Sequence, residues 1–320
     1  MNNYPNLDVF ILTYNRADYL KQMIESLCVQ TAQGFTIKIL DNASNDNTTS
    51  VINELKNKYK NRNIIHIRNE KNLGLFGNFA QSQKIASNDF TAVFHDDDIV
   101  HPELIETLMN LFNKHPRAVM ASCGYSTLYN PDSNNWPILN KSYYLWEAGR
   151  GEDFTLMLQN WCFAAMIYKT SAYKQIPYRP DLYGIIFDHP FLLEINKLGE
   201  SILLCDHGLR YRWHKSSCTF SGTRPTKIQI FNCIAAFINN SKKFKLYNLL
   251  FSSHCIFNFL KIRNTDFDSF FNEVLDDFVD RSIISEFDRK LIKIKFYRKI
   301  QYTLFKNSQK RWKKLLKHHI

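Results

Sequence analysis

The chain has 320 residues, 45% of them hydrophobic and 22% charged, so it is large and apolar enough to fold and is not disordered throughout. Its net charge of +11 comes from the C-terminal end, where Arg289 to Ile320 hold twelve Lys or Arg and no acid; 29 basic and 30 acidic residues precede them. Seven scattered cysteines without a C-x-x-C pair argue against a disulfide framework and a zinc site, and favour a reducing compartment.

The first residues are polar and lead straight into a short strand pattern, so we expect no signal peptide. No window reaches the roughly 18 uninterrupted apolar residues that a membrane-spanning helix needs. The most apolar candidate, residues 246–260, is interrupted by polar side chains such as Asn248 and His254. We therefore expect a soluble, intracellular protein.

Strand and helix patterns alternate in the N-terminal third of the chain. Residues 7–13 form a continuous apolar run, which is typical of a strand buried on both faces. Three further apolar runs, residues 35–40, 64–67 and 91–94, are separated by segments with apolar residues at helical spacing. The alternation predicts an α/β fold, in which right-handed helical crossovers join the strands of a parallel sheet.

Each of these four expected strands ends in polar residues: 14–16, 41–46, 69–74 and 96–98. In parallel α/β sheets ligands bind beyond the carboxyl ends of the strands, so the four loops are expected to converge on one rim. Asp41 could accept a hydrogen bond from a base or a ribose there. Ordinary turn and helix-cap chemistry is the alternative for the Asp, Asn and Ser residues of these loops.

Three adjacent carboxylates, Asp96, Asp97 and Asp98, follow the fourth expected strand. Like charges a few Å apart repel and raise one another's pKa, so a cation or a set of donors has to offset them. Mg²⁺ or Mn²⁺ takes oxygen ligands and is often shared with substrate phosphates. The alternative is an acidic, solvated turn in which Asp98 caps the next helix.

The later part of the chain carries many aromatic residues and then a helical pattern. Aromatic faces commonly stack on sugars, so we expect this segment to form ligand-binding walls, although each ring taken alone is more typical of the core than of a contact. The rings concerned are Trp136, Tyr143, Tyr144, Trp146, Trp161 and Tyr183. Past Thr223 helical spacing takes over, which predicts a first domain over residues 1–222 and a helical region over residues 223–320.

The final segment interleaves its basic residues with rings and aliphatic side chains, including Phe296, Phe305 and Trp312. This pattern predicts a basic amphipathic helix that binds an anionic membrane surface. A nucleic-acid-binding tail is disfavoured, because the chain has no RNA- or DNA-binding motif. A solvated helical face is the remaining alternative.

Four motifs, in their order and spacing, resemble those of the family 2 glycosyltransferases of the GT-A fold: I-L-T-Y-N-R, L-D-N-A-S-N-D-N-T, N-x-G at Asn72 to Gly74, and F-H-D-D-D-I. Weaker matches at Phe187-Asp188-His189 and Arg212-Trp213-His214 extend the resemblance to about residues 7–218. It implies a GT-A (Rossmann-like), mostly parallel sheet flanked by helices. The implied reaction moves a sugar, with inversion, from a nucleotide sugar (most often a UDP-sugar) to a hydroxyl, with Mn or Mg as the divalent metal.

The resemblance also implies a role for individual residues. Asp188 matches the catalytic base, for which a helix N-cap before Pro190 is the alternative. Asp97, as first choice, and Asp98 match the metal ligands, and His214 matches a late histidine that reaches metal or diphosphate in some members. The implied nucleotide-sugar-binding residues are Thr13, Tyr14, Asn15, Arg16, Asp41, Asn42, Ser44, Asn72, Gly74 and Asp96.

Three positions depart from the family pattern. His95 stands where many members have the first acidic residue of the metal motif, and Phe187 replaces the usual acid before the base. Asn42 replaces a common second aspartate. Which of the three aspartates binds metal therefore stays open.

We expect this glycosyltransferase to build a bacterial surface polysaccharide or lipooligosaccharide on a glycan or lipid-linked saccharide acceptor. It would work in the cytoplasm as a peripheral protein on the inner face of the cell membrane. A sugar-nucleotide pyrophosphorylase is one alternative, but it would need a glycine-rich phosphate loop after the first strand, and no glycine precedes Gly34. A non-catalytic sugar-nucleotide-binding or membrane-scaffold protein is the other.

Overall fold

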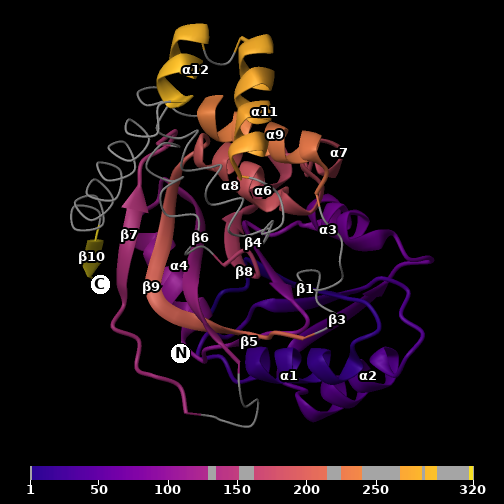
Figure 1. The fold of residues 1–320 in the computed structure, drawn as a ribbon. Helices are drawn as coiled ribbons and strands as arrows, with labels where there is room; N and C mark the ends of the chain where they lie inside the picture. Colours follow the sequence, from indigo (N-terminus) through magenta and orange to yellow (C-terminus); the bar gives the residue numbers. More distant parts are fainter. Residues whose placement is uncertain are drawn as a thin grey trace.

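The computed structural model describes residues 2–128, 135–150, 162–214, 225–239, 267–282, 285–293 and 317–319. Within these ranges ten strands form one mixed sheet in the order β10-β7-β9-β6-β8-β4-β1-β2-β3, with the short β5 paired to β9. Helices lie on both sides of this sheet (Figure 1). The expected α/β architecture of a sheet flanked by helices is confirmed.

The four strands expected from the sequence make the parallel half of the sheet. They are β1 (Leu7–Thr13), β2 (Thr36–Asp41), β3 (Asn63–Arg68) and β4 (Phe90–His95). Thr13 pairs with Asp41, Asp41 with Arg68, and Leu12 with His95. Because the four strands run in parallel and in step, their polar ends meet at one edge, as expected.

Four helices belong to this half: α1 (Ala17–Cys28), α2 (Thr48–Lys58), α3 (Gly74–Ile85) and α4 (Leu104–Lys114). The apolar residues of α1 recur every three or four positions, so one face is buried while the other stays polar. Leu20, Ile24 and Leu27 on that face are 0% exposed and join the core under the sheet. Gly74 begins α3 with a φ of 71°, a conformation that glycine adopts readily.

The other half of the sheet mixes strand directions. It contains β5 (Ile99–Val100), β6 (Ala118–Thr127), β7 (Ser142–Trp146), β8 (Ala165–Lys169) and β9 (Glu200–Tyr211). β8 lies antiparallel to both β4 and β6, and β7 and β5 lie antiparallel to β9; β6 and β9 are parallel. The sheet is therefore less parallel than expected. Antiparallel neighbours need no crossover helix, so strand–helix alternation does not reveal them.

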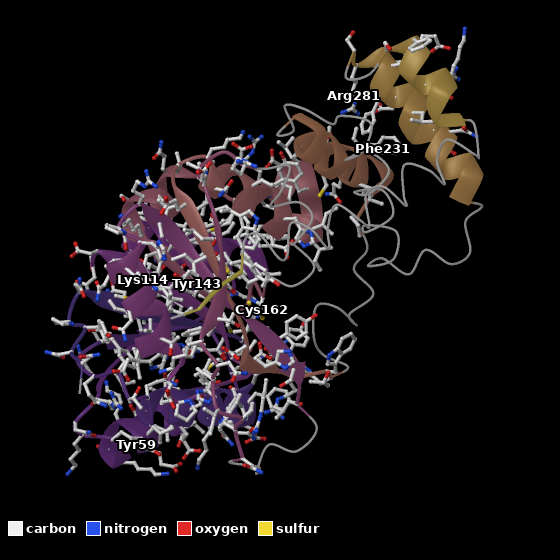
Figure 2. The ribbon with its side chains drawn as sticks, turned by 90° about the vertical axis from the view of Figure 1, so that its left-hand side faces the viewer. Tyr59, Lys114, Tyr143, Cys162, Phe231 and Arg281 are labelled. Carbon is white, nitrogen blue, oxygen red and sulfur yellow. The ribbon has the colours of Figure 1, made fainter. Side chains whose placement is uncertain are left out.

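The remaining helices cover one end of the sheet. They are α6 (Thr170–Gln175), α7 (Pro180–Tyr183), the 3₁₀ turn η2 (Gly184–Ile186), α8 (Asp188–Asn196), α9 (Lys227–Asn239), α11 (Phe267–Asp280) and α12 (Glu286–Lys293). Figure 1 shows α9, α11 and α12 stacked at this end, and in Figure 2 α11 and α12 project away from the sheet. None of the helices in the described residues has the length and apolar character needed to cross a membrane.

The C-terminal tail differs from expectation where it is described. Lys317–His319 form strand β10, which pairs antiparallel with the edge strand β7, and are not helical. An open edge strand offers unpaired N–H and C=O groups, and this pairing satisfies some of them. Residues 294–316, which carry the rest of the expected amphipathic helix, lie outside the described residues, as does the expected domain boundary at residue 222.

Several rings of the expected sugar-binding walls belong to the core or to packing around it. Tyr143 and Trp146 are 2% and 1% exposed, and Tyr144 and Tyr183 pack partly buried against a core cluster. Figure 2 shows Tyr143 inside the sheet layer beside Lys114, whose Nζ lies 5.5 Å from the ring centroid. The Trp136 ring contacts two polar side chains: its centroid lies 4.0 Å from Arg210 Cζ and 5.1 Å from the centroid of the His101 ring. Trp161 lies outside the described residues.

Candidate active site

The loops after β1 and β2 are bonded to each other at the rim. The Asn15 N–H donates to Ser44 Oγ (2.9 Å), and the Asn15 side-chain oxygen accepts from the Asn45 N–H (2.8 Å). The Ala17 N–H donates to Asp46 Oδ2 (3.0 Å). Asn15 has a φ of 52°, in the left-handed region that Asn tolerates better than most residues. These contacts fix the loop that carries the expected nucleotide-binding residues.

The two residues before Asn15 differ in exposure. Thr13 ends β1 and is 2% exposed, and its carbonyl accepts the Asn42 N–H (3.0 Å). Tyr14 is 42% exposed at the start of the loop. The Tyr14 ring is therefore open to solvent at the rim, whereas the Thr13 side chain is buried beneath it.

Asp41 is wholly buried, and both of its carboxylate oxygens accept hydrogen bonds from the protein. Oδ1 accepts the Ser44 N–H (2.8 Å), while Oδ2 lies 3.1 Å from His66 Nε2 and 2.7 Å from Arg68 Nη1. Burial alone would raise the pKa of Asp41, but the hydrogen bonds from His66, Ser44 and Arg68 outweigh it and lower the pKa to about 2. A nucleotide at this rim would meet the Arg68 side chain, 44% exposed, before it met the Asp41 carboxylate.

Asn42 ties the second loop to the third. Its Nδ2 donates to Asn72 Oδ1 (2.8 Å) and to the Gly74 carbonyl (3.2 Å), while its Oδ1 accepts from Asn69 Nδ2 (3.0 Å) and the Leu73 N–H (2.9 Å). An ionised aspartate accepts hydrogen bonds but donates none, so it could not make the first two contacts. The departure from the family pattern at Asn42 therefore serves the packing of these loops.

The aspartates after β4 meet cationic side chains from two distant segments. Arg16 Nη1 lies 3.1 Å from Asp96 Oδ1 and 3.0 Å from Asp97 Oδ2. His214 Nε2 lies 2.9 Å from the same Asp97 oxygen. The first loop and the segment after β9 thus converge on Asp97.

Arg212 fixes the backbone of this convergence. Its N–H donates to Asp98 Oδ1 (2.9 Å), and its Nε donates to the Asp97 carbonyl (2.7 Å). The guanidinium also lies 4.6 Å from the centroid of the Tyr19 ring. The motif Arg212-Trp213-His214 does not by itself indicate this positioning role of Arg212, because both contacts depend on how the distant segments meet.

Burial and mutual repulsion govern the electrostatics of the three carboxylates. Burial, followed by the neighbouring charge of Asp97, raises the pKa of both Asp96 and Asp98. Asp98 is 0% exposed, and within the described residues its Oδ2 has no hydrogen-bond partner. A buried carboxylate oxygen without a partner is costly, which points to a group that the protein binds there.

The side chains at this point fit a divalent cation. His95, Asp97 and Asp98 each offer one ligand atom, and these atoms lie within 4.8 Å of one another. Burial lowers the pKa of His95, and the lower pKa favours the neutral imidazole that ligates metals. The buried Nε2 of His95 has no hydrogen-bond partner in the described part of the chain. Imidazole nitrogen and carboxylate oxygen together suit ions such as Mn²⁺.

This grouping differs in one member from the set Asp97, Asp98 and His214 that the sequence suggested. His95 was treated as a departure from the family pattern, yet it lies with the two aspartates, whereas His214 contacts Asp97 by a hydrogen bond. The signal was present in the sequence, because His95 is the last residue of β4, next to the aspartates at the carboxyl edge.

Asp188 is the first residue of α8 and is partly buried. Burial lowers the pKa of His95, and the charges of Asp97 and Asp188 act against that shift, so Asp188 is close enough to His95 for its charge to be felt there. The N-cap position of α8 is Phe187, and no side chain caps the helix. Within the described residues no hydrogen bond or ion pair engages the Asp188 side chain, so its carboxylate is available to a ligand.

Phe187 and His95, two departures from the family pattern, meet in one aromatic cluster. Phe187 is 4% exposed and lies 5.7 Å from Phe79 and 5.5 Å from Phe163, between ring centroids. His95 lies 6.0 Å from Phe79 and 6.5 Å from Phe163. An acid at position 187 would be buried among these rings, so the phenylalanine matches its surroundings.

This mixed sheet with a charged rim is the GT-A fold of glycosyltransferases. Residues 1–349 of the S. aureus protein TarS, whose structure was solved with UDP-GlcNAc, superpose with a TM-score of 0.66 at 16% identity, over 97% of this chain and 92% of that TarS fragment. The sequence model of glycosyl transferase family 2 matches residues 8–176, which is more than half of the chain. The chain belongs to glycosyl transferase family 2.

Curated relatives match shorter stretches. An uncharacterised glycosyltransferase of Methanocaldococcus jannaschii is 38% identical over 104 residues, which are 32% of this chain and 35% of that protein. The abequosyltransferase RfbV of Salmonella typhimurium is 25% identical over 199 residues, 57% of this chain and 58% of its own length. The chain thus spans less than two thirds of the length of these relatives.

Proposed function

We propose that this protein is a metal-dependent, inverting glycosyltransferase that moves a sugar from a nucleotide-sugar donor to a hydroxyl of an acceptor. The convergence of Arg16, Asp97 and His214 from three separate segments carries the proposal, because it gathers charges suited to a diphosphate and its cation at one edge of the sheet. Membership of glycosyl transferase family 2 supports it. The UDP-GlcNAc bound by TarS makes a UDP-sugar our first choice of donor.

We assign the donor site to the rim formed by the loops after β1, β2 and β3. The exposed Tyr14 ring and the Arg68 guanidinium would contact the nucleotide, while Asp41, Asn42 and Ser44 hold the loops in place. The remaining residues proposed around the nucleotide sugar are Thr13, Asn15, Arg16, Asn72, Gly74 and Asp96.

We assign the metal to Asp97 and Asp98, with His95 as the third ligand and His214 directed at Asp97 and the diphosphate. The bound cation would neutralise the charge that develops on the departing diphosphate. Arg16 donates from the first loop to the Asp97 carboxylate, while Arg212 holds the Asp97 carbonyl and the Asp98 carboxylate in position.

Asp188 is the proposed catalytic base. Within the described residues no donor engages the Asp188 carboxylate, which can take the proton of the acceptor hydroxyl as the new glycosidic bond forms. Inversion by a single displacement needs one such base and no protein nucleophile. The partly buried position of Asp188 beside the aspartate motif suits this role.

The proposed acceptor is a glycan or a lipid-linked saccharide of a bacterial surface polysaccharide or lipooligosaccharide. The named activity of the abequosyltransferase RfbV, a sugar transfer, supports an acceptor of this kind. We further propose that the protein works in the cytoplasm, bound to the inner face of the membrane through the twelve basic residues after Asp288.

Calorimetric titration of the protein with UDP-GlcNAc, GDP-mannose and their relatives, with Mn²⁺ or with EDTA, tests the donor proposal. We expect one donor to bind in a metal-dependent way and to release its nucleoside diphosphate when an acceptor extract is added. Donor binding without any turnover would favour the non-catalytic alternative. Absence of binding to every nucleotide sugar would remove the proposal.

Truncation after Asp288 tests the membrane proposal. We expect the shortened chain to bind anionic vesicles less than the full chain, and added salt to weaken binding of the full chain. The melting temperature of both proteins has to be compared, because β10 pairs with the sheet. Equal vesicle binding by both proteins would refute the membrane role of the tail.

A further inference from the structure

Three aromatic side chains form a continuous surface strip beside the candidate active site. Tyr125 lies on β6, Tyr211 ends β9, and Trp213 follows two residues later. The ring centroids of Tyr125 and Tyr211 are 5.6 Å apart, and those of Tyr211 and Trp213 are 6.1 Å apart. Tyr125 is 39% exposed and Trp213 is 49% exposed. We call these three residues the aromatic strip.

The segment after β9 alternates between the charged site and this strip. Arg212 and His214 contact the aspartates and also the Tyr19 ring, at 4.6 and 4.9 Å. Tyr211 precedes Arg212, Trp213 lies between Arg212 and His214, and the rings of Tyr211 and Trp213 contact each other. Side chains in an extended segment point alternately to opposite sides, so one segment serves both features. A molecule lying on Trp213 would therefore be next to a group bound at His214.

Exposed large aromatic side chains are rare in the described part of the chain. They are Tyr14, Tyr125, Trp213 and Phe287, and the first three lie around the candidate site. Other rings of the same half of the sheet, such as Tyr143, Trp146 and Tyr168, are at most 2% exposed. Exposing apolar rings to water costs free energy, so a group of exposed rings in a fold that buries most of its aromatic residues marks an interaction surface.

We propose that the aromatic strip is the binding site for the saccharide acceptor, an inference that rests on the proposed glycosyltransfer function. A pyranose ring has one face of C–H groups, whose slightly positive hydrogens are attracted to the negative face of an aromatic ring. Its hydroxyl edge stays free for polar contacts, which the Tyr125 hydroxyl can supply. Sugar rings lying along the strip would reach Trp213, next to His214 and its contact with Asp97, where the terminal hydroxyl would react.

Acceptor binding can be measured apart from donor binding. Saturation-transfer NMR and calorimetry would use the full chain and a panel of four- to six-ring oligosaccharides of hexose, deoxyhexose and N-acetylhexosamine. We expect Trp213→Ala and Tyr125→Ala each to weaken binding of the recognised oligosaccharide by about three- to ten-fold, the size of a lost ring contact. Trp213→Phe should retain most of the affinity, because it keeps a ring.

Phe287→Ala is the matched control, since it removes an exposed ring, 70% exposed, that lies on α12 outside the strip. It should leave oligosaccharide affinity unchanged. Calorimetric affinity for UDP-GlcNAc with Mn²⁺ should be the same for the strip variants and the wild type, and melting temperatures should show that all variants are folded.

Each possible result separates this inference from the proposed function. Oligosaccharide binding that is absent in the wild type, or equal in the wild type and both alanine variants, would overturn the inference even if donor binding is normal. If the wild type binds no oligosaccharide and Trp213→Ala loses binding to anionic vesicles, the strip belongs to a membrane contact and the inference is overturned. If Trp213→Ala instead changes the oligomeric state, the strip belongs to a contact with a second copy of the chain, with the same consequence. Failure to bind any nucleotide sugar would instead refute the proposed function.

Discussion

The two halves of the sheet contribute to the site in different ways. In the parallel half, β1, β2, β3 and β4 end in step, and the loops that follow them meet because the topology brings them together. In the mixed half, Arg212 and His214 reach the aspartates from more than a hundred positions further along the chain. The parallel half thus gathers the loops of the proposed donor site by its architecture alone, whereas the mixed half adds its contribution through particular side-chain contacts.

β4 and β8 join the two halves of the sheet, and the two-residue strand β5 brings the segment after β9 to the aspartates. In β5, Ile99 pairs with Arg210 and Val100 with Leu209. Ile99 directly follows Asp98, and Arg210 stands two positions before Arg212. The register of this pairing decides which residues of the later segment face Asp97 and Asp98. Single substitutions can therefore test what each half of the sheet contributes to the site.

The largest expected effect belongs to the carboxylate on which the segments converge. Asp97→Asn removes one charge at the proposed metal site, so Mn²⁺-dependent release of nucleoside diphosphate should fall below detection. Mn²⁺ affinity, measured by electron paramagnetic resonance without donor, should also fall by at least ten-fold, the loss expected for a site residue. Because the residue lies on the rim, the fold should survive.

Asp89→Asn is the control for this substitution. Asp89 is exposed and precedes β4, at the opposite end of the same strand. It should leave both activity and Mn²⁺ affinity unchanged. Wild-type activity of Asp97→Asn in the presence of EDTA would show that the metal assignment is wrong.

The next effect concerns the mixed half, where Asp188 is the proposed base. Asp188→Asn keeps the size of the side chain but cannot accept the proton, so single-turnover rates should fall by about 10²- to 10⁴-fold. Donor affinity should stay within a few-fold of that of the wild type, because the base acts on the acceptor.

Asp181→Asn serves as the control from the same region, since Asp181 is exposed and pairs with Arg179. It should turn over donor like the wild type. If Asp188→Asn instead lowers the melting temperature and its activity follows the folded fraction, the residue has a structural role and no part in proton transfer.

Substitution of His95 sharpens the comparison at the junction of the halves. His95→Phe keeps a ring against Phe79 and Phe163 but removes the nitrogen, so Mn²⁺ affinity should fall by about 10- to 100-fold. Paramagnetic resonance of Mn²⁺ in the absence of donor provides the measurement. Unchanged Mn²⁺ affinity would exclude His95 as a ligand and favour His214 in its place.

The smallest effect is on stability and belongs to the parallel half. The pKa of Asp41 is lowered to about 2 in the folded state, so its stabilising contribution is complete above the unfolded pKa near 4 and is lost as the pH falls through about 2. Asp41→Asn should lower the free energy of unfolding at pH 7 by about 2 kcal/mol.

Urea titrations of Asp41→Asn and of the wild type at several pH values provide the measurement. The difference between the two proteins should shrink as the pH falls from about 4 toward 2. A difference that stays constant over this range would mean that the His66 and Arg68 contacts do not stabilise the charged carboxylate.

The sequence predicted the parallel half well, for a physical reason. Strands such as β1, buried on both faces, must be continuously apolar, and the polar loops at their carboxyl ends stand out against them. The placement of Arg16 beside the aspartates and of Asn42 beside Asn72 and Gly74 follows from that pattern.

The mixed half was harder to predict. β5 has only two residues, too few to show any periodicity, so the contact of Arg212 with Asp98 has no local signal. In the parallel half, the position of His95 beside the aspartates was visible in the sequence, but the distances that group its ring with Asp97 and Asp98 were not. The burial of Tyr143 and Trp146 was likewise not visible, because it depends on tertiary packing.

The contact between Asp98 and Arg212 also has a consequence for how the enzyme is made. It joins residues 114 positions apart, and closing so long a loop is a slow, late event compared with forming local contacts. During synthesis the N-terminal strands emerge first, with the aspartates but without Arg212 and His214. A nascent or truncated chain that ends before β9 would therefore present an incomplete charged centre, and nucleotide sugars would not be consumed by protein that has yet to finish folding.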